Sequence, residues 1–391
     1  MAKRKNGEGS WGVKTIKGKQ YKYFRDAAGK YTYGKTDAEI KEKIKKAKRH
    51  QTISVKSEVV TIREYMLNWL AMTRSKKLKQ QTYDNYELII ESYLDLPNMK
   101  FGSHNIKNLN YELVQRYINT LTDQYSLGTI RKIWSVVRQC LRYGMARYEL
   151  PKFDLALIQM PSEENVAVKA KEVPFATIED MEALYQEAFR KIEGKNLNGE
   201  AQCGSYMYGN NARAIIIIMY TGLRISELCA LKWGNVDMVN KSIRVEHTHA
   251  VAKNREKDAK TKTKIITSLP KTYHQRTIPL SKRAYEQFEF FHSLNPNHTP
   301  EDYVCITRNN TAMARRNIYR TLKQMLTRCN ANTELTPHAL RHGFGSVLLK
   351  NGVEIKTISE LMGHKDIRTT YNVYIGITNQ QKFDAIKTLD W

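Results

Sequence analysis

Long apolar runs are missing from this sequence. The longest candidate, residues 212–220, is far shorter than the roughly 18 residues that a helix needs to cross a bilayer, and there is no lipidation motif. The first residues, MAKRKNGEG, lack the apolar stretch of a secretory signal. These absences argue against a membrane or secreted protein, so we expect a cytoplasmic chain without a membrane partner.

Cysteines and cofactor motifs are also scarce. The five cysteines are scattered, odd in number and without metal-site spacing, so we expect reduced, mostly buried thiols. No glycine-rich phosphate loop is present, and no cluster of carboxylates suggests a two-metal nuclease. The sequence therefore predicts no nucleotide, metal or other cofactor. The cysteines are Cys140, Cys203, Cys229, Cys305 and Cys329.

Acidic residues are few relative to basic ones. The chain has 39 Asp and Glu against 64 Lys and Arg, which gives a formal net charge of +25. Such an excess indicates a polyanionic partner, and without a membrane segment nucleic acid is favoured. A length of 391 residues exceeds what one compact core usually holds, so two or three domains are expected.

Residues 335–374 gather side chains suited to phosphodiester chemistry. Thr336 and Pro337 are typical of a helix N-cap and first helical position, so His338 falls in a first turn, where free N–H groups favour an anion. Arg341 follows three residues later on the same helix face. Apolar residues spaced for a core-facing stripe complete this predicted helix: Leu340, Phe344, Val347 and Leu348.

A second predicted helix covers residues 355–362. Gly363 ends it and leaves His364 just beyond its C-terminus. Tyr374 follows ten positions later, with Tyr371 one turn before it. A lone histidine or tyrosine at such a position is usually structural, but the combination favours catalysis.

This combination resembles the tyrosine recombinase (phage-type integrase) family. In that family a His-x-x-Arg motif is followed by Gly-His and then by a nucleophilic tyrosine. His338, Arg341, the pair Gly363-His364 and Tyr374 match these positions in order. The resemblance extends over most of the chain.

Two further basic positions extend the resemblance. Residues 221–228, TGLRISEL, look like the family's other arginine box and contain Arg224. The family also has a catalytic lysine in a strand turn upstream of an Ile-Pro dipeptide, and Lys271 holds that place before Ile278 and Pro279. Nearby lysines remain alternatives, namely Lys260, Lys262 and Lys264.

The resemblance implies how these residues act on DNA. A phosphodiester has anionic oxygens and a poor leaving group, so a catalyst must supply positive charge, a nucleophile and an acid. Arg224 and Arg341 would donate to the non-bridging oxygens. Tyr374 would attack the phosphorus and form a 3′-phosphotyrosine, which conserves the bond energy without ATP. Lys271 would protonate the 5′ oxygen.

Three other residues are given supporting roles by the same resemblance. His338 would handle the tyrosine proton, and His364 would hydrogen-bond the phosphate. Glu227, three residues after Arg224, is interpreted as orienting His338 or an arginine.

The N-terminal segment is predicted to be a small basic module. Residues 11–36 alternate apolar and polar side chains around glycine-containing turns, which predicts a three-stranded sheet, and residues 37–50 form a lysine-rich helix candidate. A sheet can bind in a DNA groove, and this module resembles the arm-binding domain of conjugative-transposon integrases. A merely solvated surface is the alternative. The candidate DNA contacts here are Lys14, Lys22, Arg25 and Lys30.

The fold expected from these patterns is multidomain α+β. Residues 1–58 would hold the arm-type module and a linker, and residues 59–161 a helical core-binding bundle that opens with a Thr61-x-x-Glu64 capping box. Residues 162–173 would link this bundle to a mainly α-helical catalytic domain, residues 174–391, with a small antiparallel sheet. Lys76 and Lys77 in the bundle are further DNA candidates.

Within the predicted catalytic domain three regions bear on the site. Residues 195–211 contain Asn198-Gly199, so we predict a hairpin insertion, with a disordered loop as the alternative. The apolar run at residues 212–220 fits a strand or a buried helix, and we choose the helix because a glycine follows it. Strands are expected at residues 242–251, 265–269 and 276–280.

The resulting prediction is a site-specific recombinase that excises and integrates a mobile element. Its expected partners are double-stranded DNA at core and arm-type sites, further copies of itself from dimer to tetramer, and an accessory excision or DNA-bending protein. The C-terminal residues 375–391 predict a short amphipathic helix that docks on a neighbouring protomer, or else on its own domain. A type IB topoisomerase and a catalytically inactive DNA-binding regulator are the alternatives.

Overall fold

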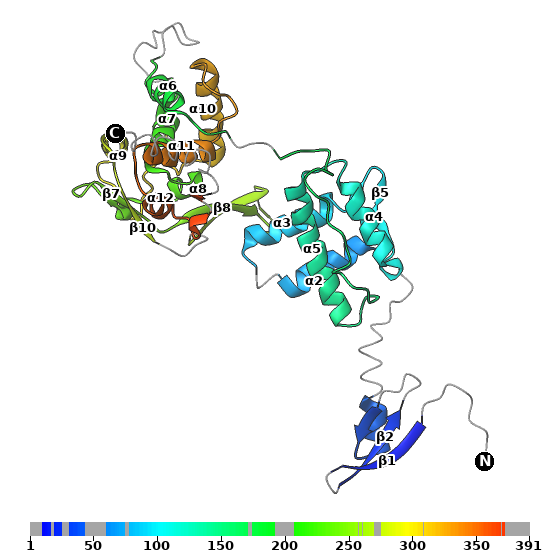
Figure 1. The fold of residues 1–391 in the computed structure, drawn as a ribbon. Helices are drawn as coiled ribbons and strands as arrows, with labels where there is room; N and C mark the ends of the chain where they lie inside the picture. Colours follow the sequence, from blue (N-terminus) through cyan, green and yellow to red (C-terminus); the bar gives the residue numbers. More distant parts are fainter. Residues whose placement is uncertain are drawn as a thin grey trace, which may run out of the picture. The chain divides into compact units, whose positions relative to one another are not determined.

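The computed structural model shows a multidomain α+β protein (Figure 1), as expected. It has an N-terminal three-stranded sheet, a helical part and a mainly helical C-terminal part with small sheets. In the part of the chain that is described, no helix is long and apolar enough to cross a membrane. The described residues are 10–16, 19–25, 31–43, 60–74, 78–170, 174–191, 207–256, 258–259, 261–269, 275–307, 309–368 and 370–371.

The N-terminal sheet is antiparallel with the strand order β1-β2-β3, which confirms the predicted three strands. Residues 37–43 are helical and pack on one face, where Lys22 pairs with Asp37 at 3.2 Å and the buried Ile40 contacts Gly34. The strand register places Lys14 and Arg25 on the opposite face. The strands are β1 Ser10–Ile16, β2 Lys19–Arg25 and β3 Tyr31–Gly34.

The helical part begins at the predicted capping box. The Thr61 backbone N–H donates to Glu64 at 2.8 Å, and the Glu64 N–H donates to the Thr61 hydroxyl at 3.2 Å. Besides the expected helices there is a short hairpin, β4 Asp95–Leu96 with β5 Met99–Lys100. The helices are α2 Ile62–Arg74, α3 Gln80–Ser92, α4 Tyr111–Leu121 and α5 Leu127–Ala146, with single 3₁₀ turns at Phe101–Ser103 and Ile106–Asn108.

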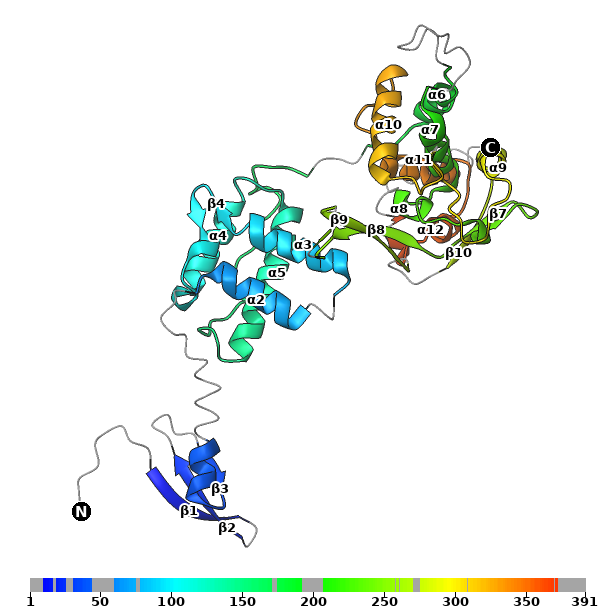
Figure 2. The same cartoon turned by 180° about the vertical axis from the view of Figure 1, so that it is seen from behind.

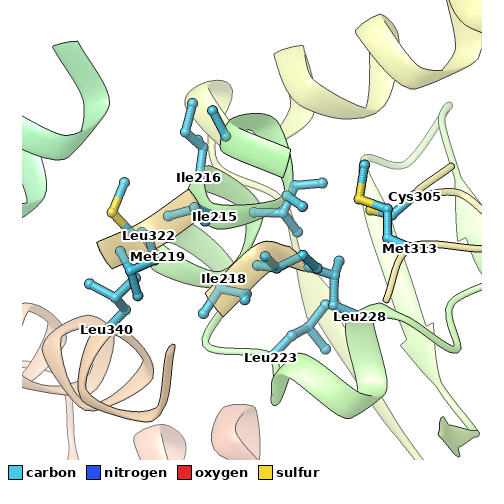
Figure 3. Close-up of a cluster of buried hydrophobic side chains, with 14 of the residues drawn as sticks. Ile215, Ile216, Ile218, Met219, Leu223, Leu228, Cys305, Met313, Leu322 and Leu340 are labelled. Atoms are coloured by element: carbon cyan, nitrogen blue, oxygen red, sulfur yellow. The ribbon is translucent and has the colours of Figure 1, made fainter. Parts of the chain in front are cut away.

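The C-terminal part is organised around a buried helix, α7 Gly209–Thr221. Its isoleucines at 215–218 are all fully buried, because α7 packs against α6, α9, α10 and α11 (Figures 2 and 3). The prediction of a buried helix is therefore confirmed. The helix also starts earlier than predicted, so residues 209–211 belong to α7 and not to a hairpin, while residues 195–206 of the predicted insertion lie outside the described residues.

The other helices of this part pack against α7 or, in the case of α12, against α11 and strand β10. The capping box of Thr177 and Asp180 opens α6, and Thr336 caps α11 by accepting from the Ala339 N–H. The predicted helix at residues 355–362 is confirmed as α12, which ends at Gly363 in a left-handed conformation. The helices are α6 Ile178–Ala188, α8 Ile225–Leu228, α9 Lys282–Leu294, α10 Arg315–Arg328, α11 Pro337–Lys350 and α12 Ile355–Met362, with a 3₁₀ turn at Trp233–Asn235.

Two small sheets accompany these helices where one was expected. The order of the first is β10-β7-β6, and the second is the hairpin of β8 and β9. The two runs that flank Lys271 thus belong to different sheets, because β9 pairs with β8 and β10 pairs with β7. The strands are β6 Val236–Asp237, β7 Ser242–Val245, β8 Thr248–Lys253, β9 Thr263–Ser268 and β10 Arg276–Pro279.

Candidate active site

Three separate segments bring the matched side chains together. Arg224 is the N-cap of α8, His338 and Arg341 lie in the first turns of α11, and His364 follows the end of α12. Both arginines act electrostatically on both histidines, so the four side chains form one cluster. Tyr374 and Lys271 lie outside the described residues, whereas Tyr371 is helical and 40% exposed.

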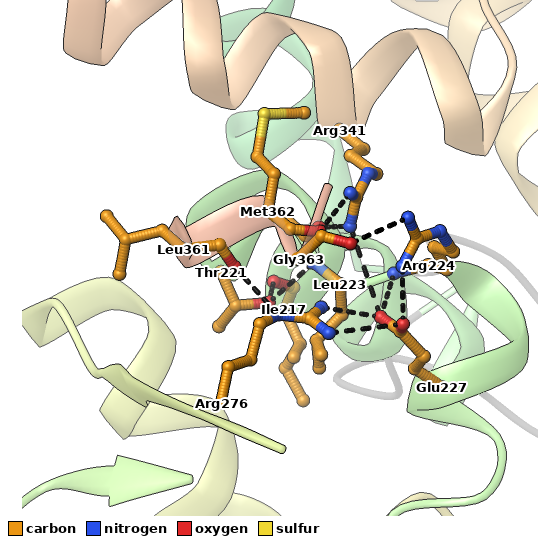
Figure 4. Close-up of polar contacts among 11 residues, drawn as sticks. Ile217, Thr221, Leu223, Arg224, Glu227, Arg276, Arg341, Leu361, Met362 and Gly363 are labelled. Carbon is orange, nitrogen blue, oxygen red and sulfur yellow. Dashed lines mark hydrogen bonds and ion pairs between the residues drawn. The ribbon is translucent and has the colours of Figure 1, made fainter. Parts of the chain in front are cut away.

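Arg224 is held in place from two sides. Its guanidinium donates to Glu227 Oε1 at 2.7 Å and to the Gly363 carbonyl at 3.3 Å (Figure 4). Glu227 Oε2 also accepts the Arg224 backbone N–H at 3.0 Å. The side chain remains 33% exposed, so it is accessible from solvent.

Arg341 is fully buried, although the sequence predicts a direct phosphate contact. Its two terminal nitrogens donate to the carbonyls of Gly222, at 2.5 Å, and of Met362. These carbonyls belong to the end of α7 and the end of α12, so Arg341 joins three helices through one side chain. A direct contact with a phosphate requires that the residues enclosing this side chain move, because it is fully buried.

The histidines of the cluster are neutral near pH 7. His338 is exposed, and desolvation together with the charges of Arg341 and Arg224 lowers its pKa. Burial and then the same two arginines lower the pKa of His364 to about 3. The Nδ1 atom of His364 lies 2.8 Å from the hydroxyl of Thr370, which fixes the ring. Neutral imidazoles can accept a proton or share one with an anion.

The partners of Glu227 are arginines. Burial alone would raise the pKa of Glu227. A hydrogen bond and the charge of Arg276, followed by the charges of Arg224 and Arg341, instead lower this pKa to about 2. Of the two roles suggested by the sequence, the structure therefore supports the orientation of an arginine. Arg276 was not predicted, and its position two residues before the Ile278-Pro279 dipeptide is the only sequence signal that points to it.

A mostly apolar cleft of about 550 Å³ opens beside His338. Strands β8 and β9 line it with His249, Val251 and Ile265, and the N-terminal end of α10 adds two arginines. Sequence reasoning missed these arginines, Arg315 and Arg316, because the motifs do not extend to α10. Of the alternative lysines, Lys264 pairs with Glu256 at 2.9 Å and Lys262 is exposed, while Lys260 lies outside the described residues.

The candidate DNA contacts of the N-terminal module divide between the two faces of its sheet. Lys22 lies on the helix-covered face and is paired with Asp37, whereas Lys14 and Arg25 lie on the helix-free face beside tyrosines. Arg25 lies 5.4 Å from the ring centre of Tyr31, within cation–π range. Lys30, Lys76 and Lys77 lie outside the described residues.

A cluster of arginines and neutral histidines on a helical scaffold is suited to holding a phosphodiester. Comparison with known sequences agrees with a protein that acts on a phosphodiester. The Phage integrase family matches residues 200–381, and the N-terminal SAM-like domain of phage integrases matches residues 61–122. The chain belongs to the tyrosine recombinase (phage integrase) family, whose members carry out site-specific DNA recombination.

Individual relatives match along most of their length. The chain is 28% identical to a XerC-like tyrosine recombinase of Caldanaerobacter subterraneus subsp. tengcongensis, over 94% of this chain and 93% of the relative. It is 24% identical to the integrase of Staphylococcus phage L54a, over 90% and 98% of the two chains.

Solved structures show the same fold at lower identity. The integrase of transposon Tn1549, in complex with a circular intermediate DNA, has a TM-score of 0.62 at 19% identity over 81% of this chain and 95% of that one. A lambda integrase dimer bound to a COC′ core site has a TM-score of 0.55 at 16% identity over 95% and 96% of the two chains.

Proposed function

We propose that this protein is an integrase that excises and integrates a mobile DNA element through a 3′-phosphotyrosine intermediate. The observation that carries the proposal is the cluster of Arg224, Arg341, His338 and His364, which three separate segments assemble. Tyr374 follows ten positions after the last member of this cluster. The shared fold with a transposon integrase supports the mobile-element assignment.

In the proposed cleavage step, the Tyr374 hydroxyl oxygen attacks the scissile phosphorus. His338, neutral in the folded protein, accepts the phenol proton, and the bond from phosphorus to the 5′ oxygen breaks. Lys271 protonates that oxygen as it leaves. The 5′-hydroxyl of another strand then attacks the phosphotyrosine, which releases Tyr374 and joins the strands.

Arg224 and His364 hold the phosphate during this exchange, with the charge of Arg341 beneath them. The developing negative charge is then stabilised by donors that are already in place. Glu227 keeps Arg224 oriented through two hydrogen bonds. Because the arginines supply the charge and the phosphotyrosine conserves the bond energy, the scheme uses neither metal nor ATP.

The domain division that we propose follows the sequence. Residues 1–58 form the arm-binding module with its linker, residues 59–161 the core-binding domain, residues 162–173 a linker, and residues 174–391 the catalytic domain. Support comes from the capping boxes that open α2 and α6 near the starts of the two larger domains, and from the family matches inside each of them.

DNA is the proposed partner of all three domains. The helix-free face of the N-terminal sheet, with Lys14 and Arg25, would contact arm-type sites, and the other two domains would hold the core site. Lambda integrase has been solved as a dimer on a core site and as a tetramer on a Holliday junction, which supports a dimer-to-tetramer assembly here. An accessory excision or DNA-bending protein completes the proposed complex.

The test is covalent capture of cleaved DNA. We expect the wild-type protein to form a covalent adduct with its own element ends, Tyr374→Phe to bind without forming one, and Tyr371→Phe to keep cleaving. Sequencing the captured DNA identifies the site. Relaxation of supercoiled DNA of arbitrary sequence would point to a topoisomerase, and binding without any adduct to an inactive regulator.

A further inference from the structure

Arg276 lies at the start of β10 and is only 7% exposed. Its guanidinium donates to Glu227 Oε1 at 3.2 Å and to Oε2 at 2.7 Å, and its Nε donates to the Leu361 carbonyl at 2.8 Å (Figure 4). One side chain therefore joins the strand that follows Lys271, the carboxylate that orients Arg224, and the end of α12.

A charge buried this deeply is tolerated only with a full set of partners. Arg276 has them, because the two oxygens of Glu227 match the planar fork of a guanidinium. Glu227 is shared, since its Oε1 also accepts from Arg224 at 2.7 Å. A displacement of Arg276 therefore moves Glu227 and, through it, Arg224.

The turn before His364 is built closely around the same guanidinium. Gly363 has a φ of +63°, and a Cβ at this residue would lie 2.7 Å from a terminal nitrogen of Arg276. The Gly363 carbonyl in turn accepts from Arg224. Because residue 363 has no side chain, Arg276 can reach the last turn of α12. This contact holds the end of α12 and therefore the backbone position of His364.

We propose that Arg276 is a positioning residue that sets Arg224 and His364 relative to each other. The proposal rests on the proposed function, because it assumes that these groups act on one phosphate. Arg276 opens β10, which pairs with β7 from this residue onward. The bond from Arg276 to Glu227 thus ties strand β10 to the arginine that holds the phosphate.

The test compares two substrates in single-turnover cleavage by Arg276→Lys. One carries the normal scissile phosphate, and the other a methylphosphonate, in which a methyl group replaces one non-bridging oxygen and removes the negative charge. A misplaced Arg224 should slow cleavage mainly on the substrate whose phosphate carries that negative charge. We expect the variant to be slowed roughly 10²-fold on the phosphate and much less on the methylphosphonate.

Arg283→Lys is the matched control. Arg283 makes a similar fork to Glu182, at 2.6 and 3.3 Å, and also donates to the Tyr220 hydroxyl, and neither partner is a member of the arginine and histidine cluster. We expect this variant to cleave both substrates like the wild type. DNA binding and the melting temperature are measured alongside for both variants.

Equal slowing of Arg276→Lys on the two substrates, or no slowing at all, would overturn the positioning role. If that variant does not fold, Arg276→Gln, which keeps a hydrogen-bond donor and leaves Glu227 intact, is measured in the same way. Absence of an adduct with the wild-type protein on the normal phosphate would instead refute the proposed function, so the two failures are distinguishable.

Discussion

The histidines of this site differ from surface histidines because their surroundings keep them uncharged. His342, one turn after His338, is 6% exposed and contacts the ring of His338 at 4.3 Å between centroids. Burial, followed by His338 and Arg341, lowers the pKa of His342 to about 4. The folded protein thus holds this ring neutral at a pH where an unfolded chain would protonate it.

This difference predicts a pH-dependent stability with a definite sign. Between about pH 6.5 and pH 4 the unfolded chain binds a proton that folded His342 does not, so the free energy of unfolding falls by up to about 1.4 kcal/mol per pH unit as the pH is lowered. We expect His342→Phe, which keeps an aromatic ring against Phe175, to lose less stability over this range. Thermal unfolding at pH 7 and pH 4.5 measures the effect, and identical losses in both proteins would contradict it.

Lys271 is the second residue with a specific expected effect. If its ammonium protonates the 5′ leaving oxygen, Lys271→Ala should slow cleavage by roughly 10²–10⁴-fold. A sulfur atom in place of that oxygen leaves without protonation, so the same variant should cleave the sulfur-containing DNA at nearly the wild-type rate.

Lys262→Ala and Lys264→Ala are the controls for this experiment, since both lysines precede Lys271 by fewer than ten positions. An equal defect of Lys271→Ala on both substrates would assign the acid elsewhere. A defect in either control that sulfur rescues would identify the acid directly.

At the scale of elements, the site depends on where helices stop. Helices α7 and α12 both end in glycines with left-handed backbones, Gly222 and Gly363. The carbonyls at these ends are the ones that Arg341 binds. Two helix ends far apart in sequence are therefore joined by one buried arginine from a third helix, α11.

The N-terminal sheet gives a prediction at the same scale. Its helix-free face carries Lys14 and Arg25, while Lys22 is paired with Asp37 on the other face. Replacing Lys14 or Arg25 by Gln should weaken binding to arm-type DNA. The slope of log K against log salt should fall by about 0.9 for each phosphate that the variant no longer neutralises.

Lys22→Gln serves as the control, because it removes one positive charge as the other two variants do. It should leave the slope nearly unchanged. Deletion of residues 1–58 should remove the affinity for distal sites altogether. If the deleted protein showed the same slope of log K against log salt as the full-length protein, these lysines would be only solvated surface.

At the scale of the whole molecule, exchange of two pairs of strands requires several protomers to act in order. The C-terminal residues predict an amphipathic helix with Phe383, Ile386 and Leu389 on one side, and its apolar face needs a partner. We propose that the helix docks on the next protomer in a cyclic, head-to-tail arrangement, which would couple Tyr374 to assembly.

Truncation after Gly376 tests this arrangement. Binding of one protomer to DNA should persist, because the truncation leaves the arginine cluster untouched, whereas assembly on paired sites should fail and cleavage should change. Gel-shift assays on single and paired sites separate the two effects. Normal assembly and recombination by the truncated protein, or its unfolding, would contradict docking in trans.

The sequence by itself determined the family, the main helices and the residues that the motifs contain. Capping boxes at Thr61 and Thr177, the glycine after α12 and the helical spacing of α11 are local signals, since each depends on residues within a few positions of one another. For this reason the helix at residues 355–362 was predicted with its bounds unchanged.

Only the tertiary structure decided which charges meet. Arg276 and Glu227 are 49 positions apart, and Arg224 and Gly363 are 139 apart, so no local pattern predicts either contact. The same limit explains why β9 and β10 were not assigned to separate sheets, and why the burial of Arg341 was not predicted. Burial depends on which elements surround a residue, and here the ends of α7 and α12 meet the Arg341 side chain of α11, whereas the spacing showed only that Arg341 shares a helix face with His338.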